Sequence, residues 1–437
     1  MKDKHLPINW ITIKLENIAQ IQSGGTPSRS VSSYWGGNVP WIKISDIKDR
    51  YIKEAEEYIT EEGVNNSSAK VFKKGTVLFS IFATIGKVGI LDIDAATNQA
   101  IVGIVPDKDL DKVYLMYVLK NLSHQIAEQG KGIAQKNINI SILKKTLIPL
   151  PPLAEQKRIA DKLDVLFGQL NIVQKAIERI PELIKNFRQQ ILSSAVTGKL
   201  TEEWRKGKNL DKWEDESIGS LFNVQTGSTP RRENNAYYNL GTIPWIKSGE
   251  VKNALIFNSN EYITELAIQE TNAKIYPINT ILIAMYGEGK TRGQVGLLKI
   301  PAASNQAVAA LVNDKGYDIA TIKYVFFFCL SQYNKIRNQA KGGNQPNLNL
   351  ATIKKWGISL PPQKEQEEIV KIIDSIFKKL EAIEQQYNAL KSKIEKLPQA
   401  LLNKAFSGEL VEHLPSDGDA ETLLREIEQL KRTISKK

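Results

Sequence analysis

Two stretches of the chain share one pattern, in which apolar residues recur at alternating steps of three and four. The first runs from 159 to 191 and the second from 369 to 401, with each apolar position repeated 210 residues later. Such steps are typical of a helix that buries one seam against another helix. The pattern predicts two matched, pairing helices with the seam residues Ile159, Leu163, Leu166, Leu170, Ile177, Ile184, Ile369, Ile373, Ile376, Leu380, Ile383 and Tyr387.

Both stretches contain features that modify a simple helix pair. Pro181 and Pro398 interrupt them at non-equivalent places, and each should either kink its helix or mark a joint between two packed pieces. Because the apolar register passes through both, we favour kinks. Phe167 and Phe377 lie beside the seam, where a two-stranded coil prefers charges. The apolar stripe is therefore wide enough to touch something else, either the rest of the chain or another subunit.

The segments that precede the two stretches also repeat each other. The offset between matching positions grows from 203 to 210 along these segments and then stays constant through the helices. Insertions have thus collected in loops, because an insertion in a helix would rotate its seam. The matched pairs include Pro40-Trp-Ile-Lys43 with Pro244-Trp-Ile-Lys247, Glu57-Tyr-Ile-Thr60 with Glu261-Tyr-Ile-Thr264, and Asn98-Gln-Ala100 with Asn305-Gln-Ala307.

Within each segment, short apolar runs alternate with turns. The runs at 76–82, 88–91 and 100–105, with their repeats at 280–286, 295–298 and 307–312, predict strands, and 112–129 and 318–339 predict helices. The predicted fold class is α+β, with two pseudo-repeated domains separated by two long coiled-coil helices, whose relative direction the apolar repeat does not determine. The expected divisions are a first domain at 1–152, its helix at 153–200, a second domain at 201–362, its helix at 363–410, and a tail at 411–437.

The tail has no counterpart in the first half of the chain. Its residues from Glu421 to Arg432 predict a short amphipathic helix, which is either a surface appendage or a docking segment for a partner.

Composition and charge limit the possible classes of protein. The 437 residues are 42% hydrophobic and 24% charged, and no apolar run approaches the length that spans a bilayer. A single cysteine, Cys329, excludes an intrachain disulfide framework, so we expect a cytoplasmic protein without a membrane association. The net charge of +11 lies mainly in the two globular segments and favours a polyanionic partner there.

A catalytic constellation is not evident. The three histidines, His5, His124 and His413, lack the company of a metal site or a catalytic triad. The stretch 287–293 lacks the glycine spacing of a phosphate-binding loop, and Asn38-Val-Pro-Trp41 lacks one proline of the adenine methyltransferase motif. We therefore expect no catalysis and no cofactor or metal bound by this chain.

Duplicated polar loops are the best candidates for nucleic-acid contact. They carry Arg and Lys, which grip guanine and phosphate, and Asn and Gln, which read adenine. The alternative is that these are well-formed turns with solvated charges or loop-packing contacts. The candidates are Thr26, Ser28, Arg29, Lys43, Lys87, Lys131, Gln135, Lys136, Asn137, Thr229, Arg231, Arg232, Lys247, Lys290, Arg292, Lys341, Asn344, Gln345 and Asn347.

These motifs together resemble a known family. Each half carries a Gly-x-Thr/Ser-Pro turn, Pro-Trp-Ile-Lys, Pro-Pro-x-x-Glu-Gln, and a closing Ala195-Val-Thr-Gly-Lys-Leu200 or Ala405-Phe-Ser-Gly-Glu-Leu410. This arrangement, over residues 10 to about 410, resembles the specificity subunit of type I restriction–modification systems. The tail beyond Val411 lies outside the resemblance.

The resemblance implies a role for each part. The two halves would be target-recognition domains, each binding one part of a split sequence in double-stranded DNA, and the antiparallel helices would set the spacer. The subunit would recruit two adenine-N6 methyltransferase subunits, with restriction subunits joining them. S-adenosylmethionine, ATP and Mg²⁺ would then belong to those partners.

Two other functions compete with this one. A self-contained methyltransferase would transfer methyl groups alone, but its cofactor motifs are missing. A structural adaptor would bind proteins through the duplicated domains, and its binding would not fall steeply with salt, as DNA binding should.

Overall fold

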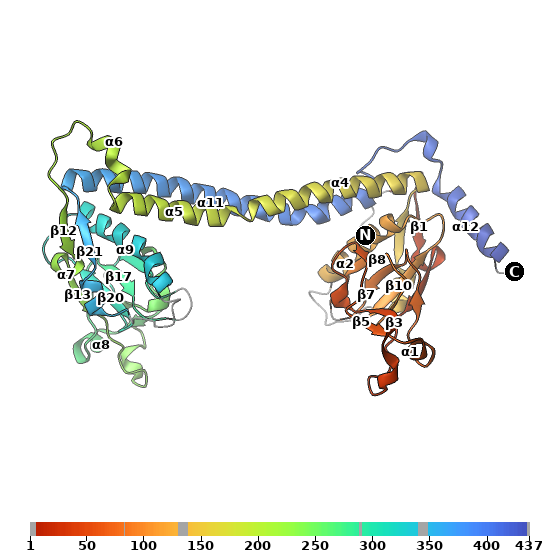
Figure 1. Ribbon diagram of the computed structural model, residues 1–437, viewed down its shortest axis with the longest axis horizontal. Coiled ribbons are helices and arrows are strands. Elements are labelled where there is room, and N and C mark those ends of the chain that lie inside the picture. Colours follow the sequence, from red (N-terminus) through yellow and green to blue (C-terminus); the bar gives the residue numbers. More distant parts are fainter. Residues whose placement is uncertain (1–5, 83, 130–138, 288–290, 340–347, 435–437) are drawn as a thin grey trace. The chain divides into compact units, whose positions relative to one another are not determined.

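The computed structural model describes residues 6–82, 84–129, 139–287, 291–339 and 348–434. The chain divides into two compact units, one of Met1–Ile177 with Asn388–Lys437 and the other of Glu178–Tyr387. Each unit combines one globular domain with the adjoining parts of the long helices (Figure 1). The division therefore falls within the helices, whereas the predicted boundaries separate helix from domain.

A five-stranded sheet, ordered β2-β10-β7-β8-β4, forms the centre of the first domain. Its neighbouring strands are antiparallel except β4, which runs parallel to β8. A four-stranded sheet, β5-β3-β9-β6, and the pair β1-β11 complete the domain. The strands are β1 Ile11–Lys14, β2 Ala19–Ser23, β3 Trp35–Ile42, β4 Tyr51–Ile52, β5 Glu57–Ile59, β6 Val71–Phe72, β7 Val77–Ser80, β8 Val88–Leu91, β9 Ala95–Thr97, β10 Ile101–Pro106 and β11 Leu147–Leu150.

The second domain repeats this topology. Its five-stranded sheet is ordered β13-β20-β17-β18-β15, and β14 pairs in parallel with β19 as β3 does with β9. An isolated bridge between Tyr276 and Ala302 stands where β6 pairs with β9 in the first domain. The strands are β12 Glu214–Ser217, β13 Asn223–Thr226, β14 Ile243–Ile246, β15 Ala254–Ile256, β16 Tyr262–Ile263, β17 Ile281–Ala284, β18 Val295–Leu298, β19 Ala303–Ser304, β20 Val308–Val312 and β21 Gly357–Leu360.

One helix in each domain packs against the five-stranded sheet. The predicted helices correspond to α2 and α9, and every predicted apolar run corresponds to a strand of one of these sheets. Continuous apolar runs form these strands because both faces of the sheet are covered. The helices of the domains are α1 Glu61–Asn65, α2 Lys112–Gln129, α3 Ile140–Lys145, α6 Glu202–Arg205, α7 Ile218–Leu221, α8 Glu265–Glu270, α9 Ile319–Gln339 and α10 Leu350–Lys354.

The long helices are α4 Leu153–Ile177, α5 Ile180–Val196 and α11 Gln363–Phe406. In the first unit, Ile159 near the start of α4 shares a core with Leu402 near the end of α11. In the second unit, Leu192 near the end of α5 shares a core with Ile369 near the start of α11. The helices therefore pair antiparallel within each unit (Figure 1).

Burial along the predicted seam follows one row of positions seven residues apart. Leu163, Leu170, Ile177 and Ile184 are all buried, at 9% exposure or less. The intervening row is less covered, and Ile383 departs from the prediction with 44% of its surface exposed. A pair of helices covers a narrow stripe, so the second row is buried only where a domain packs alongside. The other predicted seam residues comprise the buried Ile159, Ile369, Ile373 and Leu380 and the partly buried Leu166, Ile376 and Tyr387.

The two prolines differ in their effect, since Pro181 lies at a joint between two helices and Pro398 leaves its helix undivided. The first helix is divided, since α4 ends at Ile177 and α5 begins at Ile180, with Pro181 in its first turn. Proline is well tolerated there because a first-turn N–H has no helical partner to lose. Pro398 lies inside the continuous helix α11. The joint at Pro181 is a helix boundary and not a kink within one helix.

The tail folds back onto the first domain. It forms the predicted amphipathic helix as α12 Ala420–Ile434, and Leu423 and Ile427 are buried in the core of that domain. The Ala420 N–H donates to the Asn9 carbonyl oxygen at 3.1 Å. The tail is thus an integral part of its own first unit.

Candidate nucleic-acid interface

A cluster of charged and aromatic side chains joins β3, β5 and the turn before them in the first domain. The Arg29 guanidinium lies 3.6 Å from the ring centroid of Trp35 and 5.2 Å from that of Trp41. Glu57 accepts from Arg29 at 2.7 Å and from Lys43 at 2.8 Å. We call Arg29, Trp35, Trp41, Lys43 and Glu57 the first clamp.

The second domain builds the same cluster from the repeated residues. The Arg232 guanidinium lies 4.6 Å from the ring centroid of Tyr238 and 4.9 Å from that of Trp245. Glu261 accepts from Arg232 at 2.8 Å and also pairs with Lys247. We call Arg232, Tyr238, Trp245, Lys247 and Glu261 the second clamp.

The cations of each clamp favour the ionised form of its carboxylate. The hydrogen bond from Lys43, followed by that from Arg29, lowers the pKa of Glu57. The hydrogen bonds from Lys247 and Arg232 lower the pKa of Glu261 in the same way. Two cations share this carboxylate in each clamp, and in the first clamp Lys43 Nζ also pairs with Glu56 at 3.3 Å. The group that an anion can approach is therefore the partly exposed guanidinium.

The two Gly-x-Thr-Pro turns, which contain Thr26 and Thr229, are hydrogen-bonded to the clamps. The indole N–H of Trp41 donates to the Gly25 carbonyl oxygen at 3.0 Å, and that of Trp245 donates to the Ser228 carbonyl oxygen at 3.0 Å. Thr26 bonds to Gln99, and the repeated residue Thr229 bonds to Gln306. Thr26 and Thr229 therefore stabilise the conformation of their turns.

A close backbone approach explains the glycine at the start of each turn. A Cβ on Gly24 would lie 2.0 Å from Thr97 Oγ1, and one on Gly227 would lie 2.0 Å from the Ser304 carbonyl oxygen. Any larger residue would push the turn away from the last residue of β9 or β19.

The remaining described candidates lie outside the clamps. The Ser28 hydroxyl meets that of Ser30 at 2.7 Å, and Lys87 Nζ donates to the Ile44 carbonyl oxygen at 3.2 Å, so Lys87 points back into its domain. Arg231 is exposed next to Arg232, and Arg292 is partly buried in the turn before β18.

Nine candidates lie outside the described residues: Lys131, Gln135, Lys136, Asn137, Lys290, Lys341, Asn344, Gln345 and Asn347. The helices that follow two of these loops are described. Asn139 caps α3 by accepting from the Ile142 N–H at 3.0 Å, and Asn349 caps α10 by accepting from the Thr352 N–H at 2.9 Å. Each cap stabilises the start of its helix.

Sequence reasoning missed the carboxylate of each clamp and the amides of Gln99 and Gln306. Glu57 and Glu261 are visible in the repeated Glu-Tyr-Ile-Thr motif, which by itself indicated only a duplication. Their role depends on the pairing of β3 with β5 and of β14 with β16, which brings them beside Lys43 and Lys247.

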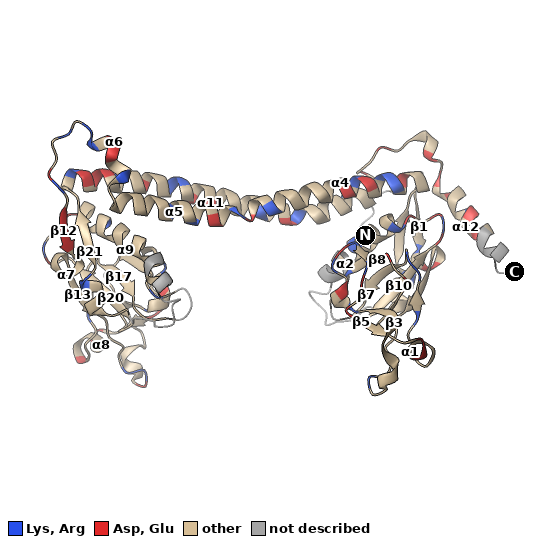
Figure 2. Cartoon of the chain, in the orientation of Figure 1, with Lys and Arg blue, Asp and Glu red and all other residues tan. Residues whose placement is uncertain are grey.

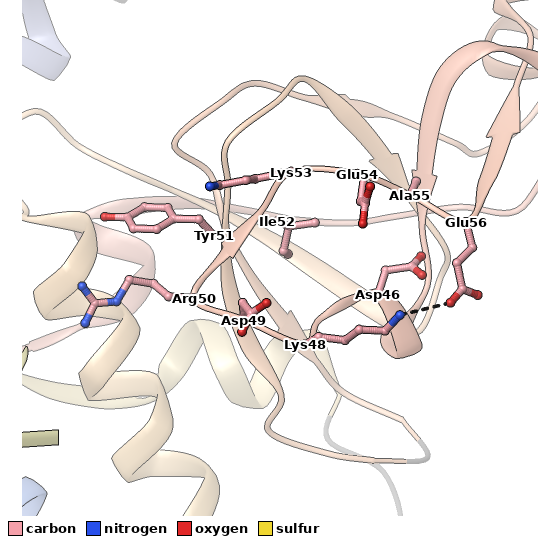
Figure 3. Close-up of a pocket in the computed structure, with 10 residues that line it drawn as sticks. All are labelled: Asp46, Lys48, Asp49, Arg50, Tyr51, Ile52, Lys53, Glu54, Ala55 and Glu56. Atoms are coloured by element: carbon pink, nitrogen blue, oxygen red, sulfur yellow. Dashed lines mark hydrogen bonds and ion pairs between the residues drawn. The ribbon is translucent and has the colours of Figure 1, made fainter. Parts of the chain in front are cut away.

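A hollow in the first domain is less suited to a polyanion. It has a volume of about 480 Å³ and is lined by residues 46–56, in which Lys48, Arg50 and Lys53 are outnumbered by Asp46, Asp49, Glu54 and Glu56. Lys48 and Arg50 point in opposite directions, and Lys48 pairs with Glu56 (Figure 3). Arg50 pairs with Asp164 on α4, and this contact joins the domain to its helix.

A second hollow, in the second domain, is mostly apolar. Its lining includes Phe257, Tyr262 and Ile275 and none of the candidate residues. This hollow is therefore separate from the candidate nucleic-acid interface.

The described residues show neither a clustered metal site nor a membrane span. Among them, no group of three or more His, Cys, Asp or Glu side chains is placed to hold a metal ion. None of the described helices is long and apolar enough to cross a bilayer. Both signs of charge are distributed along α4, α5 and α11 (Figure 2).

Buried carboxylates fix each domain to the start of its helix. Glu365 accepts from the Thr201 hydroxyl at 2.6 Å and the Trp213 indole at 2.9 Å. The repeated residue Glu155 contacts His413 Nδ1 at 2.6 Å and accepts from Asn9 Nδ2 at 3.2 Å. The glutamate of the Pro-Pro-x-x-Glu-Gln motif is thus an internal anchor in both units.

Two α+β domains that repeat the same arginine, lysine and glutamate contacts, each joined to paired antiparallel helices, define a duplicated recognition protein. The family model for the type I restriction modification DNA specificity domain matches residues 7–182 and 210–392. The chain belongs to this family.

Relatives match along nearly the whole chain. The chain is 30% identical to the type I restriction enzyme MjaIX specificity subunit of Methanocaldococcus jannaschii over 93% of this chain and 94% of the relative. It is 27% identical to the EcoKI specificity subunit of Escherichia coli K12, covering 93% and 90% of the two chains.

Solved structures share the fold. A chain from a structure of the type I R-M system matches with a TM-score of 0.68 and 18% identity, covering 92% of this chain and 99% of that one. The HsdS subunit from Thermoanaerobacter tengcongensis matches with a TM-score of 0.61 and 18% identity, covering 92% and 98%.

Proposed function

We propose that this chain is the DNA-recognition subunit of a type I restriction–modification complex. Each α+β domain binds one part of a bipartite sequence in double-stranded DNA. The paired helices carry two adenine-N6 methyltransferase subunits, which restriction subunits join. The observation that carries the proposal is the repetition of the clamp in the two domains of a member of this family, with the arginine, lysine and glutamate unchanged and Tyr238 in place of Trp35.

The clamp supports this function by its chemistry. An arginine guanidinium has five donors in a fixed plane, and the contact with glutamate engages one nitrogen, Nη2, in each clamp. About half of each arginine side chain is exposed, at 57% for Arg29 and 49% for Arg232. A partly exposed, oriented guanidinium suits a phosphate or a guanine edge.

The proposal assigns no chemistry to the chain itself. Methyl transfer and DNA cleavage belong to the partner subunits, and so do the S-adenosylmethionine, ATP and Mg²⁺ that such reactions use. What the chain supplies is recognition, and its own polar groups are engaged in building the clamps and joining domain to helix.

The test is reconstitution of the chain with its methyltransferase subunits, followed by mapping of N6-methyladenine in DNA exposed to the complex. The expected result is methylation at one split sequence, with an affinity that falls steeply as salt rises from 50 to 200 mM because phosphate contacts release counterions. Methylation by the isolated chain would identify a self-contained enzyme. Binding to the partners without any DNA recognition by the complex would identify a protein adaptor.

A further inference from the structure

The two clamps share their arginine, lysine and glutamate although the surrounding loops differ. Ser28 in the first turn corresponds to Arg231 in the second, whereas Arg29 and Arg232 agree. An asymmetric bipartite target presents different bases to the two domains. Residues that agree in both domains are therefore suited to a shared task, which is contact with the uniform phosphate backbone.

The glutamate is an unusual member of a surface that attracts phosphate. Glu57 is 31% exposed and Glu261 is 32% exposed, so each carboxylate repels an approaching polyanion. A site that needed only attraction would gain from its removal, because non-specific DNA binding grows with the available positive charge. Its presence in both clamps indicates a second role.

That role follows from the geometry of the clamp. The carboxylate holds two cations from different elements, Arg29 in the turn and Lys43 directly after β3. The guanidinium is at the same time placed over Trp35 at 3.6 Å. The ion pairs thus restrict a long, flexible side chain to one position before DNA arrives, which reduces the entropy lost on binding.

We propose that Glu57 and Glu261 are positioning residues for sequence recognition, and this rests on the proposed function. Each one fixes its arginine and lysine in the place where phosphates lie when the correct half-site is bound. Each also weakens attraction to DNA that is bound out of register. Together, these two effects raise the ratio of specific to non-specific affinity. The ordered cations attract the correct site, and the carboxylate repels DNA bound elsewhere.

The test uses the complete complex with its methyltransferase subunits and four duplexes. These are the target found by methylation mapping, the target with either half scrambled, and the target with both halves scrambled. The variants are Glu57→Gln and Glu261→Gln, with Glu57→Asp and Glu261→Asp as shorter carboxylates. Glu61→Gln and Glu265→Gln are matched controls, because these exposed glutamates lie at equivalent positions in the first turns of α1 and α8.

Scrambling the half-site read by the first domain lowers the affinity of the complex, and we call this loss of affinity the penalty. For Glu57→Gln, we expect the penalty for that half-site to be about tenfold smaller than in the wild type, a difference of about 1.4 kcal/mol. The penalty for the other half should stay unchanged, and affinity for the doubly scrambled duplex should rise. Glu261→Gln should show the converse, and the aspartate variants should be intermediate. A merely structural role would instead weaken binding to all four duplexes.

Wild-type penalties in both glutamine variants would overturn the positioning role, provided that the wild-type complex discriminates the target. A wild-type complex without discrimination would instead overturn the proposed function. Thermal melting shows whether a glutamine variant is folded. If it is not, the aspartate variant at the same position is used to test the positioning role. A reduced penalty for its own half supports the proposal, and an unchanged penalty overturns it.

Discussion

Arg50 Nη1 donates to Asp164 Oδ2 at 2.6 Å, and this ion pair joins the loop before β4 to helix α4 within the first unit. The Tyr117 hydroxyl on α2 donates to the same carboxylate at 2.6 Å. Three elements therefore meet at one half-buried carboxylate, which fixes the globular domain on its helix. The ring of Tyr117 also stacks on Phe167, one of the residues beside the seam.

Replacing Asp164 by Asn should destabilise the first unit by about 1–2 kcal/mol, since the charged partner of Arg50 is lost at a partly exposed site. Urea unfolding followed by intrinsic fluorescence measures this. Asp374→Asn, which breaks the more exposed pair with Lys323 in the second unit, is the control and should cost less than about 1 kcal/mol. Equal effects of the two changes would contradict the importance of the three-way contact.

The same residue predicts a dependence on pH. Partial burial opposes ionisation of Asp164, but the hydrogen bonds from Arg50 and Tyr117 outweigh it, so its pKa lies below the usual 3.8. A carboxyl group with a lowered pKa contributes stability above its unfolded pKa and loses it as the pH falls through the folded pKa. The stability difference between wild type and Asp164→Asn should therefore be constant from about pH 5 to 7 and shrink below about pH 4. A difference that persists at lower pH would show that the ion pair is not its source.

Glu365 is fully buried and bonded to Thr201 and Trp213, with Arg205 Nε at 3.5 Å. Glu365→Gln should destabilise the second unit by about 2–4 kcal/mol, because it leaves buried donors and the arginine without their anion. Glu367→Gln, an exposed neighbour on α11, should have almost no effect. The free energies come from chemical denaturation of the two variants, and comparable values would refute the anchoring role.

Ile427 of the tail is only 2% exposed and lies in the core of the first domain. Ile427→Ala should lower the unfolding free energy of the first unit by about 2–5 kcal/mol through lost burial and a cavity. Arg425→Ala, two residues away and exposed, is the matched control. If deletion of residues 419–437 leaves the melting temperature unchanged, the tail is not part of this core.

Gly227 approaches the Ser304 carbonyl oxygen so closely that a Cβ would lie 2.0 Å away. Gly227→Ala should displace the turn that carries Thr229 and weaken binding to the half-site read by the second domain by about tenfold. Gly249→Ala adds a Cβ that meets nothing within 4 Å and should bind as the wild type does. Half-site binding measurements on the complex compare the two, and wild-type affinity in Gly227→Ala would remove this turn from the interface.

The matched helices allow a change of spacing. Insertion of seven residues into both helices preserves the register of the apolar seam, because seven residues complete one repeat. The reconstituted complex should then methylate a target with the same two half-sites and a longer spacer. An unchanged spacer in the methylation map would show that the helices do not set the distance.

Much of the architecture was predictable because it depends on local patterns. Continuous apolar runs predicted the buried strands, and a shared apolar register predicted helices that pair. The departures from the predicted helix pair also have physical causes. Ile383 has the spacing of a seam residue, but two helices alone cannot cover both rows of the seam. Pro181 and Pro398 look alike in sequence, yet one lies in the first turn of α5 and the other inside α11.

The candidate interface was predicted less completely. Arg29, Lys43, Arg232 and Lys247 stood out as cations in repeated motifs, but their glutamate partners did not. A carboxylate 14 residues from a lysine becomes its partner only when two strands pair, and periodicity carries no information about that pairing.

The amino-acid sequence by itself determined the duplication, the helices and the kinds of side chain available for DNA, since repeats and periodicities are written along the chain. The tertiary structure decided which of those side chains are tied to one another. Strand pairing placed Glu57 and Glu261 between two cations each, and chain reversal placed the tail in the first core. Both results depend on contacts between distant residues, which are set by packing of the whole domain.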